Sequence, residues 1–366
     1  MEKLLKKPNC NKGFYVLFFM MLNFSAFAQY DKIVAKDGSG DFTSVQAAID
    51  AAPTARTTPY KIFVKAGKYI EQISIPSTKP FMELIGESPA NTILSYGDGL
   101  GGTTTFTINA NDCMLMGLTL ENSQGYLSDG PQSLAIKTVG DRAVFYNCRF
   151  ISGQDTVYHP GNGKLVYYKN CYIDGNTDFI YGSATAVFDY CVIYGRDRVD
   201  GGSGGIVTAA NTPQSQAYGQ IFRDCIIPAN NGVTVYSLGR PWQNDAGTLE
   251  PNRAGNKTVF LNTKMSTSVA PTGWSVWDAG TNTSLITYAE YKSVGFDGSP
   301  VDVSKRLSWS KQLSDAEAAP YYVNSNLFGS WNPYAVWSDL PAGNNFTPVI
   351  ALTNFRAKRT TSQAAF

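Results

Sequence analysis

The sequence has 366 residues, of which 43% are hydrophobic and only 16% are charged, and its formal net charge is +1. This composition excludes a disordered chain and argues against a nucleic-acid-binding protein, which would carry a strong basic patch. The 34 Gly, 21 Tyr and 20 Phe residues favour a fold of many short strands and turns over a helical bundle.

The first 28 residues have the features of a signal peptide. Four lysines precede an apolar run over residues 14–27, and a small-residue cleavage site ends at Ala28. We expect residues 1–28 to be removed on export, which would leave a secreted protein, periplasmic or extracellular, with no membrane attachment. A membrane anchor is the alternative, although the run is short for one. Cleavage changes the formal charge from +1 to −2, so any attraction to a polyanion must be local.

A short amphipathic helix is predicted at the start of the mature domain. Apolar residues recur with helical spacing from Val45 to Ala52, and Pro53 ends the pattern. Asp41 or Thr43 is expected to cap the helix. Such a helix can cover the first coil of a repetitive β-fold.

Nine short apolar segments follow and are predicted to be strands. They span residues 62–64, 81–85, 104–108, 114–120, 143–150, 165–173, 186–193, 219–227 and 258–261. In four of them a cysteine follows a polar residue or a tyrosine and precedes a short, mainly apolar stretch. These are Cys148, Cys171, Cys191 and Cys225.

The cysteine spacing indicates a repeat. From Cys113 onward the five cysteines of the mature chain are 35, 23, 20 and 34 residues apart. Values near 20–23 suit one coil of a β-solenoid, and the longer values suit a coil with an insertion. We therefore predict an all-β fold, a right-handed parallel β-helix (a single-stranded solenoid) with a short N-terminal capping helix, over residues 29–340. A β-sandwich is the alternative.

Stacked coils place equivalent residues about 4.8 Å apart. Cys148, Cys171 and Cys191 are therefore expected to line one interior column. That separation is compatible with a disulfide between Cys171 and Cys191, because bonded cysteines have Cα atoms about 4.4–6.8 Å apart. It is equally compatible with free thiols packed as small apolar groups.

The C-terminal region is rich in tryptophan. A short helix is predicted over residues 315–319, and the aromatic stretch around it is expected to pack back along the outside of the solenoid. Its tryptophans are Trp274, Trp277, Trp309, Trp331 and Trp337. Residues 341–366 are polar and are expected to form a loosely held tail.

Several common catalytic arrangements are absent from the sequence. The single histidine, His159, begins a Gly- and Pro-rich segment and is interpreted as a loop residue, and no Gly-x-Ser-x-Gly motif accompanies it. No zinc-type Cys or His spacing occurs. Asp197 and Asp200 lie beside glycines and are interpreted as turn formers. We therefore expect neither a metal nor an organic cofactor.

Two aspartates stand at equivalent places in the repeat. Asp155 and Asp178 are 23 residues apart, and each follows a repeat cysteine by seven residues. They should lie on adjacent coils, close enough for two ionised carboxylates to repel each other and for one pKa to rise. Such a pair suits acid–base chemistry, and coincidental stacking on the surface is the alternative.

Five motifs in order resemble those of the pectin methylesterase (pectinesterase) family, over roughly residues 33–335. They occupy residues 67–71, 154–156, 178–182, 238–242 and 274–291. Two departures occur: Tyr181 stands where the family usually has Phe, and residues 209–212 read Ala-Ala-Asn-Thr where plant members have Ala-Gln-x-Arg.

The resemblance implies an esterase acting on methyl-esterified homogalacturonan. Asp178 is then the nucleophile that forms an acyl-enzyme, and Asp155 is the general acid and base. Arg240 would hold Asp178 ionised, and the side-chain amides of Gln132 and Gln154 would stabilise the oxyanion.

Flanking residues are candidates for substrate binding. Tyr158, Tyr181 and Trp242 could face sugar rings or pack within the solenoid, and Arg198 could meet a free galacturonate carboxylate. The protein is expected to act as a monomer. Two other functions remain: a different pectin enzyme, since residues 176–178 echo the Asn-Thr-Asp motif of polygalacturonases, and a non-catalytic carbohydrate-binding solenoid.

Overall fold

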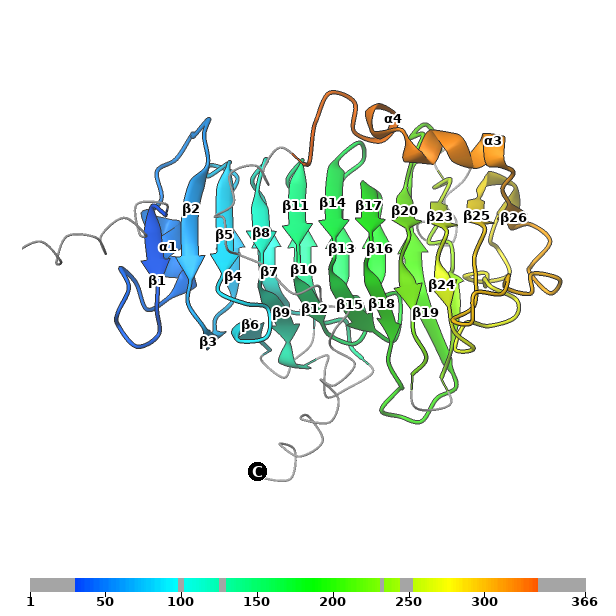
Figure 1. Ribbon diagram of the computed structural model, residues 1–366, viewed down its shortest axis with the longest axis horizontal. Coiled ribbons are helices and arrows are strands. Elements are labelled where there is room, and N and C mark those ends of the chain that lie inside the picture. The colour runs from blue at the N-terminus through cyan, green and yellow to red at the C-terminus, as the bar shows by residue number, and fades with distance from the viewer. Residues whose placement is uncertain (1–29, 98–101, 125–129, 231–233, 244–252, 335–366) are drawn as a thin grey trace, which may run out of the picture.

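The computed structural model describes residues 30–97, 102–124, 130–230, 234–243 and 253–334 (Figure 1). The predicted signal peptide and the predicted tail over residues 341–366 lie outside them. The strands stack along one long axis into three sheets whose strands run parallel. This arrangement confirms the predicted parallel β-helix and excludes the β-sandwich.

Each full coil contributes one strand to each sheet, in the order first, second, third. The first sheet contains β1 (Lys32–Val34), β2 (Tyr60–Val64), β5 (Met82–Gly86), β8 (Met114–Met116), β11 (Ala143–Tyr146), β14 (Leu165–Lys169), β17 (Thr185–Asp189), β20 (Gln220–Arg223), β23 (Lys257–Leu261), β25 (Thr287–Tyr291) and β26 (Lys311–Gln312). The second contains β3 (Gly67–Ile70), β6 (Thr92–Tyr96), β9 (Thr119–Asn122), β12 (Arg149–Ile151), β15 (Tyr172–Gly175), β18 (Val192–Gly195), β21 (Ile226–Ile227) and β24 (Lys264–Met265). The third contains β4 (Ile73–Ile75), β7 (Thr104–Ile108), β10 (Leu134–Thr138), β13 (Val157–His159), β16 (Ile180–Gly182), β19 (Gly204–Ala210) and β22 (Val235–Gly239).

The longer predicted strands are each two strands. Residues 143–150, for example, form β11 and β12, separated by a turn at Asn147, whose φ is +50°. Asn170 (+53°) and Asn262 (+49°) take the same left-handed conformation at equivalent turns. Asn tolerates this region better than most residues, so a single residue bends the chain without a Gly or Pro signal.

The repeat cysteines follow these turns and form the predicted column. Strand register aligns the residues just after Cys148, Cys171, Cys191 and Cys225 on successive coils, and all four side chains are buried. All are free thiols, so Cys171 and Cys191 are not bonded to each other. Cys113 is buried outside this column, because it directly precedes β8 of the first sheet.

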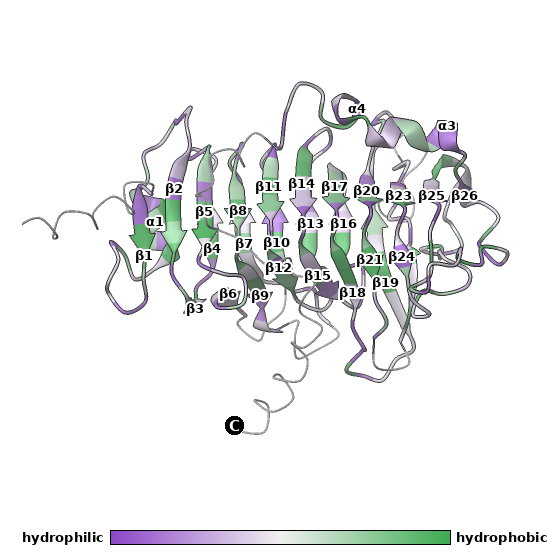
Figure 2. Ribbon diagram, viewed as in Figure 1, coloured by the Kyte–Doolittle hydropathy of each residue, from purple (hydrophilic) through white to green (hydrophobic). Residues whose placement is uncertain are grey.

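Stacked aromatic rings fill the interior behind the first sheet. Tyr168 stacks on Phe145 at 4.5 Å between centroids and on Phe188 at 4.7 Å, and the stack continues through Phe222 to Phe260. Apolar residues dominate many of the strands (Figure 2). Large buried rings contribute much of the apolar burial that stabilises a fold.

The N-terminal helix α1 (Val45–Ala51) packs on the first coils, as predicted. Its cap is Ser44, which accepts a hydrogen bond from the backbone N–H of Ala47, so the predicted caps Asp41 and Thr43 are wrong. The carboxylate of Glu71 accepts from the Ser44 hydroxyl at 2.7 Å and from two backbone N–H groups of the helix. The first family motif, which ends at Glu71, therefore fastens the capping helix to the solenoid.

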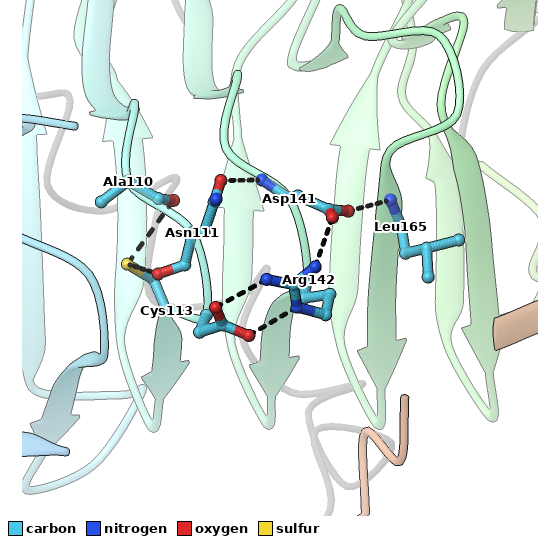
Figure 3. Close-up of polar contacts among 7 residues, drawn as sticks. Ala110, Asn111, Cys113, Asp141, Arg142 and Leu165 are labelled. Carbon is cyan, nitrogen blue, oxygen red and sulfur yellow. Dashed lines mark hydrogen bonds and ion pairs between the residues drawn. The ribbon is translucent and has the colours of Figure 1, made fainter. Parts of the chain in front are cut away.

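A charged corner ties successive coils together between the third and first sheets (Figure 3). Arg142 binds Asp141 at 2.6 Å and forms a two-pronged pair with Asp112 of the preceding coil. The other carboxylate oxygen of Asp141 accepts from the backbone N–H of Leu165, on the following coil. One aspartate thus links neighbouring coils at this edge.

The C-terminal segment lies along the outer face of the first sheet (Figure 1). It contains α3 (Asp315–Ala318), η2 (Ala319–Tyr322) and α4 (Asn324–Phe328), and η1 (Thr283–Leu285) precedes it. Trp331 packs there, as predicted.

The other tryptophans differ from that prediction. Trp274 is buried in the solenoid interior, where its ring lies 4.6 Å from Tyr288. Trp309 packs against the same interior core, while Trp277 is exposed. Trp337 lies outside the described residues. The Trp274 ring also lies 5.9 Å from that of Phe260, so it extends the interior aromatic stack towards the last coils.

Candidate active site

The two aspartates lie where the chain enters successive strands of the third sheet. Asp155 precedes β13 and Asp178 precedes β16. The backbone N–H of Asp155 donates to the carbonyl of Thr177 at 3.0 Å, and Tyr158 pairs with Tyr181 farther along the strands. The sequence-based expectation that the aspartates occupy neighbouring coils is confirmed. Both have positive φ values, +66° and +49°.

Arg240 reaches Asp178 from two coils away. Its Nε and Nη2 donate to the two carboxylate oxygens at 2.8 and 2.5 Å. Register aligns Thr208 with Gly239, so the short side chain of Ala209 lies between the coils of Asp178 and Arg240. A Cβ at Gly239 would lie 2.2 Å from the Thr208 hydroxyl oxygen. A small residue before Arg240 is therefore required by packing.

The two carboxylates have different electrostatic surroundings. Burial and the neighbouring Asp178 charge raise the pKa of Asp155 to about 7, against the opposing effects of a Tyr181 hydrogen bond and of Arg240. Burial also raises the pKa of Asp178, but the two hydrogen bonds and the charge of Arg240 oppose it directly. One carboxyl is thus suited to carry a proton near neutral pH, while its neighbour is held by a cation.

Aromatic rings extend from this pair along the third sheet. Tyr158 and Tyr181 are stacked, with centroids 4.2 Å apart and planes 5° from parallel. The ring of Trp242 lies 6.1 Å from that of Tyr181. Tyr181 therefore lies between the other two predicted binding aromatics and also hydrogen-bonds Asp155.

The two glutamines occupy neighbouring coils beside the aspartates. Gln154 directly precedes Asp155, and its side chain hydrogen-bonds that carboxyl group. Gln132 precedes β10, and its side chain is exposed. The backbone N–H of Ser133 donates to the carbonyl of Gln154, which places the two segments side by side.

Arg198 lies at the edge of the site, and its positive charge is paired with the carboxylate of Asp200. Its guanidinium binds Asp200 through two hydrogen bonds, of 3.0 and 2.6 Å, and donates to the Thr177 hydroxyl at 3.1 Å. The expectation that Asp200 only forms a turn is therefore incomplete, because it also neutralises Arg198.

Two residues differ from their sequence interpretation. His159 is the last residue of β13 rather than a loop residue; it is buried, and its Nε2 lies 2.8 Å from the hydroxyl of Tyr168. Burial lowers the pKa of His159 to about 3, so this imidazole is a neutral core group.

The Arg240 guanidinium lies 4.1 Å from the ring centroid of Trp277. The last of the five family motifs, over residues 274–291, includes Trp277, but spacing alone did not connect this residue with Arg240.

Within the described ranges, no three or more His, Cys, Asp or Glu side chains gather closely enough to hold a metal ion. Among the same residues, no helix is both long and apolar enough to cross a membrane.

The parallel β-helix, the neighbouring aspartates and the paired arginine fit the class of parallel β-helical carboxylic ester hydrolases. The family model described as Pectinesterase matches residues 31–330. Pectinesterase 31 of Arabidopsis thaliana is 33% identical over 310 residues, which cover 80% of this chain and 90% of that protein. The chain belongs to the pectinesterase family.

Solved structures agree with this assignment. Pectin methylesterase from carrot superposes with a TM-score of 0.74 at 26% identity, covering 87% of this chain and 99% of that one. A pectin methylesterase in complex with a hexasaccharide superposes with a TM-score of 0.69 at 29% identity, covering 83% and 98% respectively.

Proposed function

We propose that this protein is a secreted, monomeric esterase that hydrolyses the C6 methyl esters of homogalacturonan to pectate and methanol. The observation that carries the proposal is the pair formed by Asp155 and Asp178. One carboxyl is driven towards its protonated form near neutral pH, and the other is held by Arg240. An acid beside an anionic nucleophile is the pair that two-step ester hydrolysis needs.

In the first step, a carboxylate oxygen of Asp178 attacks the C6 carbonyl carbon of a methylated galacturonate. The resulting oxyanion accepts hydrogen bonds from the side-chain amides of Gln132 and Gln154, and such a donor contributes about 3 kcal/mol. Asp155 gives its proton to the methoxy oxygen as the C–O bond breaks. Methanol leaves, and an anhydride joins Asp178 to the sugar.

In the second step, Asp155 is ionised and removes a proton from water. The water oxygen attacks the acyl carbon of the anhydride, and the bond to Asp178 breaks. The product carboxylate is released, and Asp155 again carries its proton. Arg240 stabilises the Asp178 carboxylate at both ends of the cycle, because a guanidinium matches a carboxylate in a fixed two-pronged geometry.

Substrate would lie along the third sheet over the aromatic side chains. Tyr158 and Tyr181 cover each other's faces, so a sugar chain would meet the edges of these rings, with the Trp242 ring beyond them. The pairing of Arg198 with Asp200 weakens the case for Arg198 as the carboxylate-binding residue.

Product analysis on highly methylated pectin tests the proposal. We expect methanol release with unchanged chain length and no unsaturated uronates, and turnover that persists in EDTA. Rapid viscosity loss with new reducing ends would indicate a glycosidase. Unsaturated products that need calcium would indicate a lyase, and binding without turnover would indicate a carbohydrate-binding solenoid.

A further inference from the structure

The outward face of the third sheet carries one column of aligned side chains. Register pairs Thr107 with Lys137, Lys137 with Tyr158, and Tyr158 with Tyr181. The column therefore runs from a cation, across two stacked rings, towards the coil of Arg240. Adjacent members are about 4.8 Å apart, the separation of neighbouring parallel strands.

The cations around this column differ in their partners. Arg240 is neutralised by Asp178, and Arg198 by Asp200. Lys137 is half-buried, and its ammonium lies 5.6 Å from the centroid of the Tyr158 ring. Among the described residues, no acidic side chain forms an ion pair with Lys137. Within the described strands of the third sheet, Lys137 is the only lysine or arginine, and its charge is available to a ligand.

The position of Lys137 relates it to the chemistry. It lies one coil before Asp155 and two coils before Asp178, on the side away from Arg240, so it is about 10 Å along the sheet from the coil of the nucleophile. A polyuronate laid across Tyr158 and Tyr181 would bring the C6 group of a neighbouring sugar towards Lys137. If that group is a methyl ester it offers the ammonium only a weak neutral acceptor, whereas a carboxylate offers a full negative charge.

We infer that Lys137 binds the free carboxylate of a galacturonate that has already lost its methyl group, one or two sugars from the ester being hydrolysed. This inference rests on the proposed esterase function and specifies its substrate: a polymer with an acidic unit next to an esterified one. Because the chain without its predicted signal peptide is nearly neutral, its overall field attracts a uronate carboxylate only weakly. Recognition of that carboxylate therefore depends on a local cation.

The test compares Lys137→Met, which keeps the length of the side chain but removes its charge, with Lys137→Arg. The matched control is Lys264→Met, at an exposed lysine of β24 on the second sheet. Initial rates of methanol release are measured on fully methylated and on half de-esterified homogalacturonan. Separately, binding of a fully de-esterified hexagalacturonate is followed by tryptophan fluorescence.

We expect Lys137→Met to lower kcat/KM on the half de-esterified polymer about three- to tenfold, mainly through KM, with a smaller loss on the fully methylated one. Hexagalacturonate binding should weaken by a similar factor, Lys137→Arg should retain both properties, and the difference should shrink at high salt. Lys264→Met should match the wild type.

The inference would be overturned if the ratio of kcat/KM on the two polymers is the same in Lys137→Met as in the wild type, whether neither value falls or both fall equally. If no variant, wild type included, releases methanol, the esterase proposal fails. The hexagalacturonate measurement then still decides whether Lys137 binds a uronate carboxylate.

Discussion

Two arginine–aspartate pairs on different faces of the solenoid have the same local geometry and different surroundings. Arg223 binds Asp189 through two hydrogen bonds of 2.6 Å on the outer face of the first sheet, and Arg240 binds Asp178 through bonds of 2.8 and 2.5 Å on the third. Both aspartates are buried. The pairing itself therefore does not distinguish a structural site from a chemical one.

The neighbours of each pair make the difference. Asp189 also accepts a hydrogen bond from the Tyr167 hydroxyl, and Arg223 donates to the carbonyl of Tyr321 in the C-terminal segment that covers it. Asp178 instead lies beside a second carboxyl, that of Asp155, whose pKa it helps to raise. A covered pair with neutral partners stabilises the fold, whereas a pair beside a second carboxyl of raised pKa is suited to chemistry.

The largest expected effect is that of Asp178→Asn. An amide cannot act as the nucleophile, so kcat should fall by several orders of magnitude, on the order of 10⁴-fold. Circular dichroism should show a folded protein, since the site lies outside the aromatic core. Methanol release close to the wild-type rate would remove Asp178 from the proposed mechanism.

Asp155→Asn should lower kcat by about 10²–10⁴-fold, because the leaving methanol and the attacking water lose their proton donor and acceptor. The pH profile sharpens this prediction. Because the pKa of Asp155 is raised to about 7, the acid form is lost as pH rises through 7, and wild-type kcat/KM should fall there. The residual activity of the variant should lack that alkaline limb, whereas Asp302→Asn, at an exposed carboxylate, should retain it. An alkaline limb that persists in Asp155→Asn would assign it to another group.

Asp189→Asn is the matched change at the structural pair. It leaves Arg223 buried without its counter-ion, which should reduce the free energy of unfolding by about 3–5 kcal/mol. Urea denaturation measures that loss, and kcat at a temperature where the variant is folded should equal the wild-type value. A drop in kcat with an unchanged urea midpoint would contradict the division into structural and chemical pairs.

Much of the fold was predictable because its repeat is carried by buried residues. The column at Cys148, Cys171 and Cys191 gave the coil length, and the same offset placed Asp155 beside Asp178. The third sheet was largely missed, although it carries the site. Strands such as β13 and β16 are only three residues long, too short to show an alternating pattern, and their pairing depends on coils that are distant in sequence.

The site was predictable in its residues and in part of their environments: the expected pairing of Arg240 with Asp178 and the expected raised pKa in the aspartate pair are both present. The contact between Asp178 and Arg240 spans 62 residues, so the family resemblance implied it but spacing alone could not show it. Tertiary packing also decided the outcome at His159, whose position before Pro160 indicated a loop although its ring lies in the core. Arg198 was considered for carboxylate binding from its charge, and only the fold showed its pairing with Asp200.

The smallest expected effect is that of replacing Trp277, which contacts Arg240. The two arginine–aspartate pairs differ here too, because Arg223 contacts a hydroxyl and a carbonyl group instead of an aromatic face. The indole ring lies 4.1 Å from the Arg240 guanidinium, and a cation–π contact of this kind contributes about 0.5–2 kcal/mol. Trp277→Leu should therefore reduce kcat by about two- to thirtyfold, while Trp277→Phe should retain most of the activity.

The pH profile of Trp277→Leu distinguishes positioning of Arg240 from contact with sugar. Arg240 opposes the burial that raises the pKa of Asp178, so a loosely held guanidinium should let that pKa rise further. Because the nucleophile must be ionised, the acidic limb of kcat/KM should move to higher pH in Trp277→Leu and remain in place in Trp277→Phe. If KM alone rises and the acidic limb stays fixed, Trp277 contacts the substrate and does not position Arg240.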